Sequence, residues 1–226
     1  MSIEIYKLTP ELADEYFDFF NQRAFSDREG AFCYCTWFHF NCTIEEHYKY
    51  GKSVMQSQAD MYIKSGKLNG YLAFINGVSI GWCNVDNKEN YERINNPAAS
   101  SGICCFGKEF DSVFNAFLNA PRGGVLNPSH TIKSDPFLGR NSTHKIKAIV
   151  CFAISPDFRK KGVATALLHK AVEDAKTEGY FATESYPRLH KKIETYDYTG
   201  PIRLYEKEGF VKMAEQESTL IMRKEL

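Results

Sequence analysis

Four consecutive residues have the types and spacing of a phosphate-binding turn. Arg159, Lys160 and Lys161 are followed by Gly162, and an apolar helical pattern begins directly after the glycine. Glycine lets the backbone turn tightly, and the first amides of a helix have no partner within the helix, so they can donate to an anion. The three cations add positive charge at the same point. This stretch therefore predicts a site for a phosphate or pyrophosphate group.

The same stretch resembles the acetyl-CoA pyrophosphate loop of the GNAT acyltransferase superfamily. Residues 159–164 read Arg-x-x-Gly-x-Ala and follow an apolar strand, and residues 200–210 carry the Leu-Tyr and Gly-Phe pairs of that superfamily's second signature. Two motifs in this order and separation are more specific than either motif alone. The chain is therefore similar to a GNAT N-acetyltransferase, an acyltransferase that uses acetyl-CoA.

The resemblance implies how acetyl-CoA would bind. The loop would hold the pyrophosphate, and the edge of the preceding strand would hold the pantetheine arm by main-chain pairing. Acetyl-CoA would be a cosubstrate, and no metal is expected. The residues implied in cofactor binding are Phe152, Ala153, Ile154, Arg159, Lys160, Lys161, Gly162, Val163, Ala164 and Thr165.

Tyr205 is the general acid that the resemblance implies. Transfer of an acetyl group from a thioester releases a thiolate that needs a proton, and a phenol has an unperturbed pKa above that of a thiol. The alternative is that Leu204 and Tyr205 only pack their helix onto the sheet. The sequence departs from the family at Tyr198, where an asparagine often stands seven residues before the tyrosine.

Glu184 is the leading candidate for the general base that takes the proton of the amine. It is a charged residue in a short strand that we expect beside the cleft. A rim position or an ion pair with Arg188 explains it equally well. The sequence does not rank other candidates, among them Glu109, His144 and His190.

The segment 32–42 combines aromatic residues with thiols. Its spacing lacks the paired Cys-x-x-Cys of ordinary structural zinc sites, which favours an apolar wall over a metal site. The region after the first helix usually borders the acceptor site of a GNAT domain, so the resemblance implies that Trp37 and Phe38 bind substrate. The four potential metal ligands are Cys33, Cys35, His39 and Cys42.

Apolar periodicity and turn signals predict the elements that position these residues. The order of strands and helices is that expected of a GNAT domain: an α/β (α+β) fold with a central mixed, mostly antiparallel sheet of about seven strands flanked by helices. Residues 87–144 form a long insertion before the fourth strand, within a single domain of residues 1–226. The predicted strands are 3–8, 71–75, 78–85, 145–154, 181–186, 210–214 and 219–223, and the predicted helices are 10–23, 43–64, 162–178 and one beginning at 201.

Composition narrows the function classes. The chain has 226 residues, 43% hydrophobic and 25% charged, with a formal net charge of zero, which is ordinary for a globular protein and disfavours nucleic-acid binding. We find no leader and no apolar run that could span a bilayer, so the expectation is a cytoplasmic protein with no membrane partner. Seven cysteines without a secretion signal indicate reduced thiols.

Two functions from different classes remain open at this point. The first is N-acetylation of a primary amine, in which the acceptor is a small molecule or a peptide. The second is a non-catalytic acyl-CoA-binding or metal-responsive module on the same fold. Sheet-edge dimers are familiar in the superfamily, so a homodimer is possible.

Overall fold

Seven strands form a single sheet in the order β1-β2-β3-β4-β5-β7-β6, and only the β4–β5 pair is parallel. The computed structural model describes residues 2–39, 51–95, 145–189, 198–216 and 219–226. The predicted mixed, mostly antiparallel sheet is therefore confirmed. The strands are β1 (Glu4–Lys7), β2 (Gly70–Ile75), β3 (Val78–Asn87), β4 (Ile146–Ile154), β5 (Ala182–Ser185), β6 (Val211–Gln216) and β7 (Thr219–Glu225).

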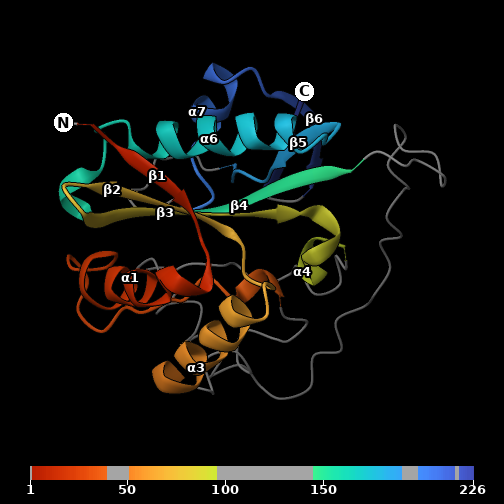
Figure 1. Ribbon diagram of the computed structural model, residues 1–226. Helices are drawn as coiled ribbons and strands as arrows, with labels where there is room; N and C mark the ends of the chain where they lie inside the picture. Colours follow the sequence, from red (N-terminus) through yellow and green to blue (C-terminus); the bar gives the residue numbers. More distant parts are fainter. Residues whose placement is uncertain (1, 40–50, 96–144, 190–197, 217–218) are drawn as a thin grey trace, which may run out of the picture.

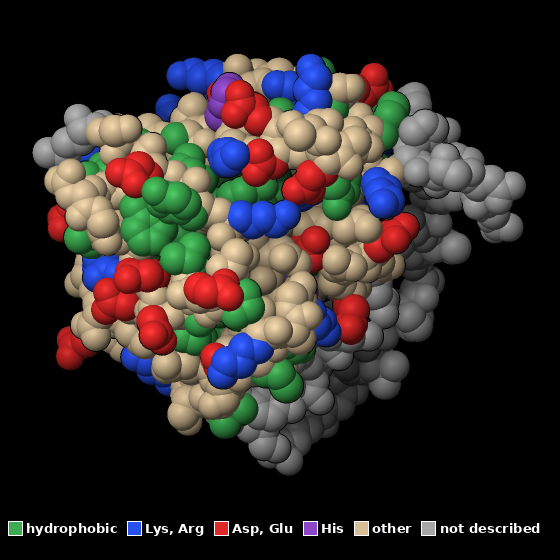
Figure 2. All heavy atoms as spheres, viewed as in Figure 1, with side chains coloured by type: hydrophobic (Ala, Val, Ile, Leu, Met, Phe, Trp, Pro, Cys, Tyr) green, Lys and Arg blue, Asp and Glu red, His purple; other side chains and the backbone are tan. Residues whose placement is uncertain are grey.

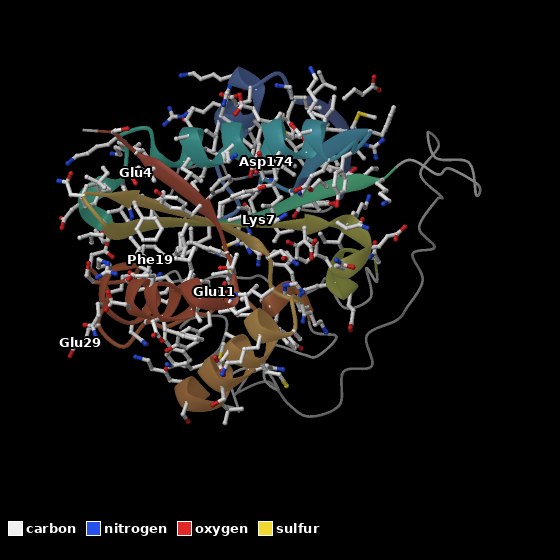
Figure 3. The ribbon with its side chains drawn as sticks, in the orientation of Figure 1. Glu4, Lys7, Glu11, Phe19, Glu29 and Asp174 are labelled. Atoms are coloured by element: carbon white, nitrogen blue, oxygen red, sulfur yellow. The ribbon has the colours of Figure 1, made fainter. Side chains whose placement is uncertain are left out.

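Helices cover both faces of the sheet. Figure 1 shows α6 (Val163–Thr177) and α7 (Ile202–Lys207) on one face, with α1 (Ala13–Asp18) and α3 (Gly51–Lys64) on the other. A buried apolar cluster fills each interface. Phe19, fully buried in the cluster on the α1 face, lies between the first helix and the sheet in Figure 3. The shorter helices are η1 (Pro10–Leu12), η2 (Phe19–Arg23), η3 (Trp37–His39), η4 (Lys88–Asn90), α4 (Glu92–Asn95) and η6 (Pro156–Phe158).

The β2–β3 hairpin follows its turn signal. Asn76 and Gly77 both have positive φ, 50° and 75°, as a type I′ turn requires at its two central residues. The flanking residues Ile75 and Val78 pair across the turn. The predicted hairpin is therefore confirmed.

Strand β4 contains an irregularity where it matters for the site. In the pairing with β3, Asn84 lies opposite Cys151 and Val85 lies opposite Ile149, so Val150 is an extra residue. Val150 and Cys151 both belong to the cluster on the α1 face, whereas Phe152 belongs to the cluster on the α6 face. A bulge of this kind bends a strand and increases its twist.

Several predicted boundaries differ from the structure. The helix predicted over 10–23 begins as the 3-10 turn η1 and ends as the π-helical segment η2. Only 51–64 of the helix predicted over 43–64 lies within the described residues, as α3. Strand β3 continues to Asn87, and η4 and α4 occupy the start of the predicted insertion. The remainder of the predicted insertion, from 96, lies outside the described residues.

Candidate active site

The predicted phosphate loop joins η6 to α6. Lys160 and Gly162 both have positive φ, 60° and 84°, so the backbone enters the left-handed region twice before the helix begins. A Cβ at Gly162 would meet no atom within 4 Å, so this position needs glycine for its backbone angle and not for space. The first amides of α6, those of residues 163–165, have no partner within the helix by geometry. The loop is exposed to solvent, and such alternating backbone conformations form an anion-binding concavity.

A glycine in β3 sets the position of this loop. A Cβ at Gly81 would lie 2.9 Å from Cγ1 of Val163 and 3.0 Å from Cδ1 of Ile154. The first turn of α6 can therefore lie directly on the sheet only because residue 81 has no side chain. The sequence analysis missed this residue, although a glycine inside a strand pattern is a known sign of close approach.

The guanidinium of Arg159 is directed away from the loop. Its Nε donates to the carbonyl of Ile154 at 3.2 Å, and Nη1 donates to Oδ2 of Asp27 at 2.6 Å. Asp27 is 132 residues away in the sequence and lies in the segment that follows η2. Arg159 thus connects the phosphate loop to the opposite face of the sheet, while Lys160 and Lys161 stay exposed at the loop.

The pairing of strands β4 and β5 ends before β4 does. They pair only from Ile146 to Ile149, and β4 then continues alone on that side to Ile154. The amide of Phe152, within this unpaired stretch, donates to the carbonyl of Tyr198 at 2.6 Å. The Phe152 amide, which was predicted to pair with a pantetheine arm, is therefore bonded to Tyr198 in this structure. Residues 198–200 form a turn that we call the 198–200 turn.

Tyr205 lies on α7 against the same stretch of β4. It is fully buried, and its ring centroid is 6.4 Å from that of Phe152 and 5.4 Å from that of Phe210. Its hydroxyl donates to the carbonyl of Thr199 at 2.5 Å. The structure therefore brings Tyr205, Phe152 and the 198–200 turn together.

Glu184 is the centre of a buried charge cluster. Its Oε1 lies 2.7 Å from Nζ of Lys88 and accepts from the Tyr186 hydroxyl at 2.5 Å, and its Oε2 lies 2.7 Å from Nη2 of Arg223. Burial alone would raise the pKa of Glu184, but Lys88, Tyr186 and Arg223 hold that pKa below its ordinary value. A carboxylate with two cationic partners is a weak proton acceptor, so its assignment as general base stays a prediction. The alternative of a rim position is wrong, because Glu184 is fully buried. Its ion-pair partners are Lys88 and Arg223, where the sequence had suggested Arg188.

A cavity of about 650 Å³ lies on the α1 face, beside η2 and the segment that follows it. Phe20, Phe25 and Phe32 give it an aromatic lining, and Asp27 and Glu29 supply carboxylates. In Figure 3 Glu29 lies at the outer margin of this segment. The Phe25 ring is 5.9 Å from that of Tyr198, so the cavity wall contacts the 198–200 turn.

The two aromatic residues predicted to bind substrate lie elsewhere. Trp37 is buried, with the guanidinium carbon of Arg93 3.6 Å from its ring centroid. Phe38 packs edge-on against Tyr91 at 6.1 Å. Neither residue is part of the cavity lining, and the aromatic residues that do line it come from η2 and from the segment that follows.

The two thiols of the 32–42 segment that the structure describes are part of the core. Cys33 and Cys35 are buried, and the Cys35 amide donates to Sγ of Cys33 at 3.2 Å. The side-chain amide of Asn84 donates through Nδ2 to the carbonyl of Cys35 at 2.9 Å, which fixes this segment to β3. Within the described ranges, which leave out Cys42, no three histidine, cysteine or acidic residues are grouped as metal ligands would be.

Two surface properties bear on partners. Acidic and basic side chains are interspersed on the face shown in Figure 2, a distribution unlike the basic stripe that binds nucleic acid. No helix in the described part of the chain combines the length and apolar character needed to cross a bilayer.

The chain is similar in sequence to one protein family and in structure to several solved proteins. The family model for the acetyltransferase (GNAT) domain matches residues 134–212. No curated protein sequence matches the chain. Among solved structures, the acetyltransferase of GNAT family from Streptococcus pneumoniae is 16% identical with a TM-score of 0.50, and covers 100% of this chain and 99% of its own. The NatC complex bound to Gag peptide and CoA has a chain 13% identical, with the same coverage and TM-score.

The two structural likenesses show the fold, and the family model adds the acetyltransferase domain. The model spans the end of the predicted insertion, β4, the phosphate loop, α6, β5 and α7. Residues 134–212 therefore match an acetyltransferase (GNAT) domain, and the fold of the chain is similar to that of the GNAT structure from Streptococcus pneumoniae.

Proposed function

We propose that this protein transfers the acetyl group of acetyl-CoA directly to a primary amine of a small molecule or peptide. One observation carries the proposal. Strand β4 leads into the loop at Gly162, is no longer covered by β5 at Phe152, and packs through Phe152 against the phenol ring of Tyr205. That order matches the pyrophosphate, the thioester arm and the leaving sulfur of acetyl-CoA. The NatC complex, which has a similar fold, is bound to CoA, which supports the same cosubstrate here.

Binding of acetyl-CoA uses backbone groups more than side chains. In the proposal, amides of residues 162–165 and the ammonium groups of Lys160 and Lys161 hold the pyrophosphate. Residues 152–154 pair with the pantetheine arm through their main chain. Arg159 contributes chiefly by positioning, because its guanidinium binds Asp27 and the Ile154 carbonyl.

Chemistry then needs one bond to form and one to break. The neutral amine attacks the thioester carbon, a C–N bond forms, and the C–S bond breaks as the thiolate of CoA leaves. Tyr205 gives its hydroxyl proton to this sulfur, and the amine loses a proton to solvent or to a carboxylate. Glu184 serves mainly to hold β5 and β7 together through Arg223, because its oxygens are occupied by cations and a phenol.

The acceptor reaches the site from the α1 face. The cavity of about 650 Å³ is within the range of small-molecule sites, and its aromatic walls suit an organic acceptor. Glu29 offers a carboxylate to an amine there, although Arg28 and Lys52 belong to the same lining. Substrate binding by Trp37 and Phe38 stays a prediction, because their described contacts are with Arg93 and Tyr91 and not with the cavity lining. We keep the proposal of one domain over residues 1–226 with an insertion at 87–144.

Calorimetric titration with acetyl-CoA tests the proposal, with two glutamate variants as a matched pair. Gly162 directly precedes α6 and Gly179 follows its end. Both have positive φ, and a Cβ at either would meet no atom within 4 Å. Gly162→Glu places a carboxylate in the phosphate loop and should abolish binding, whereas Gly179→Glu should bind as the wild type does. Absence of wild-type binding refutes the proposal.

Turnover separates the two functions left open by the sequence. With acetyl-CoA and a panel of primary amines, the wild type should release CoA. Tyr205→Phe should lower kcat by about 10²-fold or more, the usual contribution of a general acid. Acetyl-CoA binding without CoA release for any amine favours the non-catalytic module.

A further inference from the structure

We propose that the 198–200 turn is a built-in occupant of the acetyl-CoA groove, and that acetyl-CoA binds by displacing it. The ligand-free protein is then held in a closed state that can neither pair with the thioester arm nor protonate the leaving sulfur. This inference rests on the proposed function and adds its regulation.

The turn takes the backbone donor that the thioester arm would use. Phe152 lies on the edge of β4 that β5 no longer covers, and its amide donates to the Tyr198 carbonyl. A backbone amide has one hydrogen, so it cannot form a full hydrogen bond with a peptide carbonyl and a ligand carbonyl at once. Both residues are buried, with exposed fractions of 4% and 7%, so water does not compete well for this bond.

The next residue of the turn, Thr199, accepts a hydrogen bond from the hydroxyl group whose proton the chemistry needs. Tyr205 donates its hydroxyl hydrogen to the Thr199 carbonyl. A phenol has a single hydrogen, so while this bond persists the proton is directed at the turn and not at a sulfur. One short segment therefore occupies both groups on which binding and catalysis depend.

Gly200 makes the closed state possible. It has φ of 81°, and a Cβ there would lie 3.0 Å from the hydroxyl oxygen of Tyr205 and 3.2 Å from Cε2 of the same ring. The turn can lie against Tyr205 in this conformation only with glycine at this position. Gly209, just beyond the other end of α7, has φ of 83°, but a Cβ there would have no neighbour closer than 3.9 Å.

Occupation of the groove lowers the apparent affinity for acetyl-CoA. Only the open fraction of molecules binds, so the apparent Kd equals the intrinsic Kd divided by that fraction. A change that destabilises the closed turn raises the open fraction and tightens binding. Most variants at a binding site weaken binding, so the expected direction is distinctive.

Gly200→Ala and Gly209→Ala form the test pair. Both place alanine in a left-handed conformation beside α7, but only the first creates a contact with Tyr205. We expect Gly200→Ala to bind acetyl-CoA about tenfold more tightly than the wild type by calorimetry, because opening of the 198–200 turn relieves its left-handed alanine, whereas Gly209 does not move on opening. We expect Gly209→Ala to bind as the wild type does. In the ligand-free proteins, amide exchange read by NMR should be faster at Phe152 in Gly200→Ala than in Gly209→Ala.

Each outcome decides a separate point. Equal or weaker binding by Gly200→Ala, with wild-type binding intact, overturns the inference and leaves the proposed function standing. Rapid exchange of the Phe152 amide in the ligand-free wild type overturns the closed state itself. No binding by any of the three proteins refutes the proposed function, and the competition with it.

Tyr205→Phe keeps the inference testable if Gly200→Ala does not fold. The variant removes the hydrogen bond to Thr199 and adds no atom. Loss of one hydrogen bond from the closed state should tighten acetyl-CoA binding about threefold while turnover falls. Unchanged or weaker binding by Tyr205→Phe contradicts the proposed displacement.

Discussion

Replacing Glu184 with glutamine should cost this protein about 3 kcal/mol of stability. The carboxylate is fully buried and lies 2.7 Å from the Lys88 ammonium and 2.7 Å from the Arg223 guanidinium. Glutamine keeps the volume but removes the counter-charge of Arg223, whose side chain is only 5% exposed. Removal of one partner of a buried ion pair costs about 3–5 kcal/mol. Lys88 is 25% exposed and can turn to water, so we expect the lower end of that range.

Urea unfolding followed by tryptophan fluorescence measures this cost. Asp60→Asn is the control, because the Asp60–Lys64 pair is as short, 2.6 Å, but lies on the surface of α3. That variant should change the free energy of unfolding by less than about 0.5 kcal/mol. The double variant Glu184→Met with Arg223→Met should recover most of the loss, because it leaves no buried charge unpaired.

A loss below about 0.5 kcal/mol for Glu184→Gln would refute the structural role that we assign. The same variant also tests the prediction of a general base. If Glu184 takes the proton of the amine, kcat should fall by about 10²-fold or more in protein that is still folded. If the residue only holds β5 to β7, kcat per folded molecule should stay close to the wild-type value.

Two further predictions concern the contact between α6 and the sheet at Gly81, and the buried imidazole of His39. Gly81→Ala should destabilise the protein by about 1–3 kcal/mol and weaken acetyl-CoA binding, because its Cβ would displace Val163. Adding Val163→Ala should restore part of the stability, measured by urea unfolding, and part of the binding, measured by calorimetry. Burial, followed by the charge of Lys67, lowers the pKa of His39 to about 4, below its ordinary value near 6.5. The unfolded chain therefore binds more protons between these values, and stability should fall by about 2 kcal/mol more in the wild type than in His39→Phe from pH 7.5 to pH 5; equal losses would contradict this.

Local signals in the sequence account for the parts of the fold that were predicted correctly. The helix after Gly162 shows a regular apolar stripe, and Asn76-Gly77 specifies a tight turn through its positive φ angles. Each signal lies within the element that it predicts. The turn at Gly162 and the start of α6 belong to this class, whereas phosphate binding there stays a prediction.

Contacts between distant segments account for what the sequence did not reveal. Arg159 was predicted to face a phosphate, yet its guanidinium meets Asp27 from the other face of the sheet. The partners of Glu184 come from η4 and β7, and no periodicity links them to β5. Pairings of this kind depend on how the strands are ordered in the sheet, which residue patterns within one segment do not encode.

The extra residue at Val150 makes the geometry of the site depend on the exact number of residues in β4. The bulge lies directly after the last β4–β5 pair, at Ile149, and strands bend at bulges. A chain without Val150 would keep Cys151 and Phe152 on their present faces, since strict alternation from Ile149 would place them there. Its β4 would be straighter and would be expected to pair with β5 beyond Ile149. A deletion of three nucleotides should therefore straighten β4 at the cost of one buried side chain in the cluster on the α1 face, and an alignment of relatives should show this position protected from deletion.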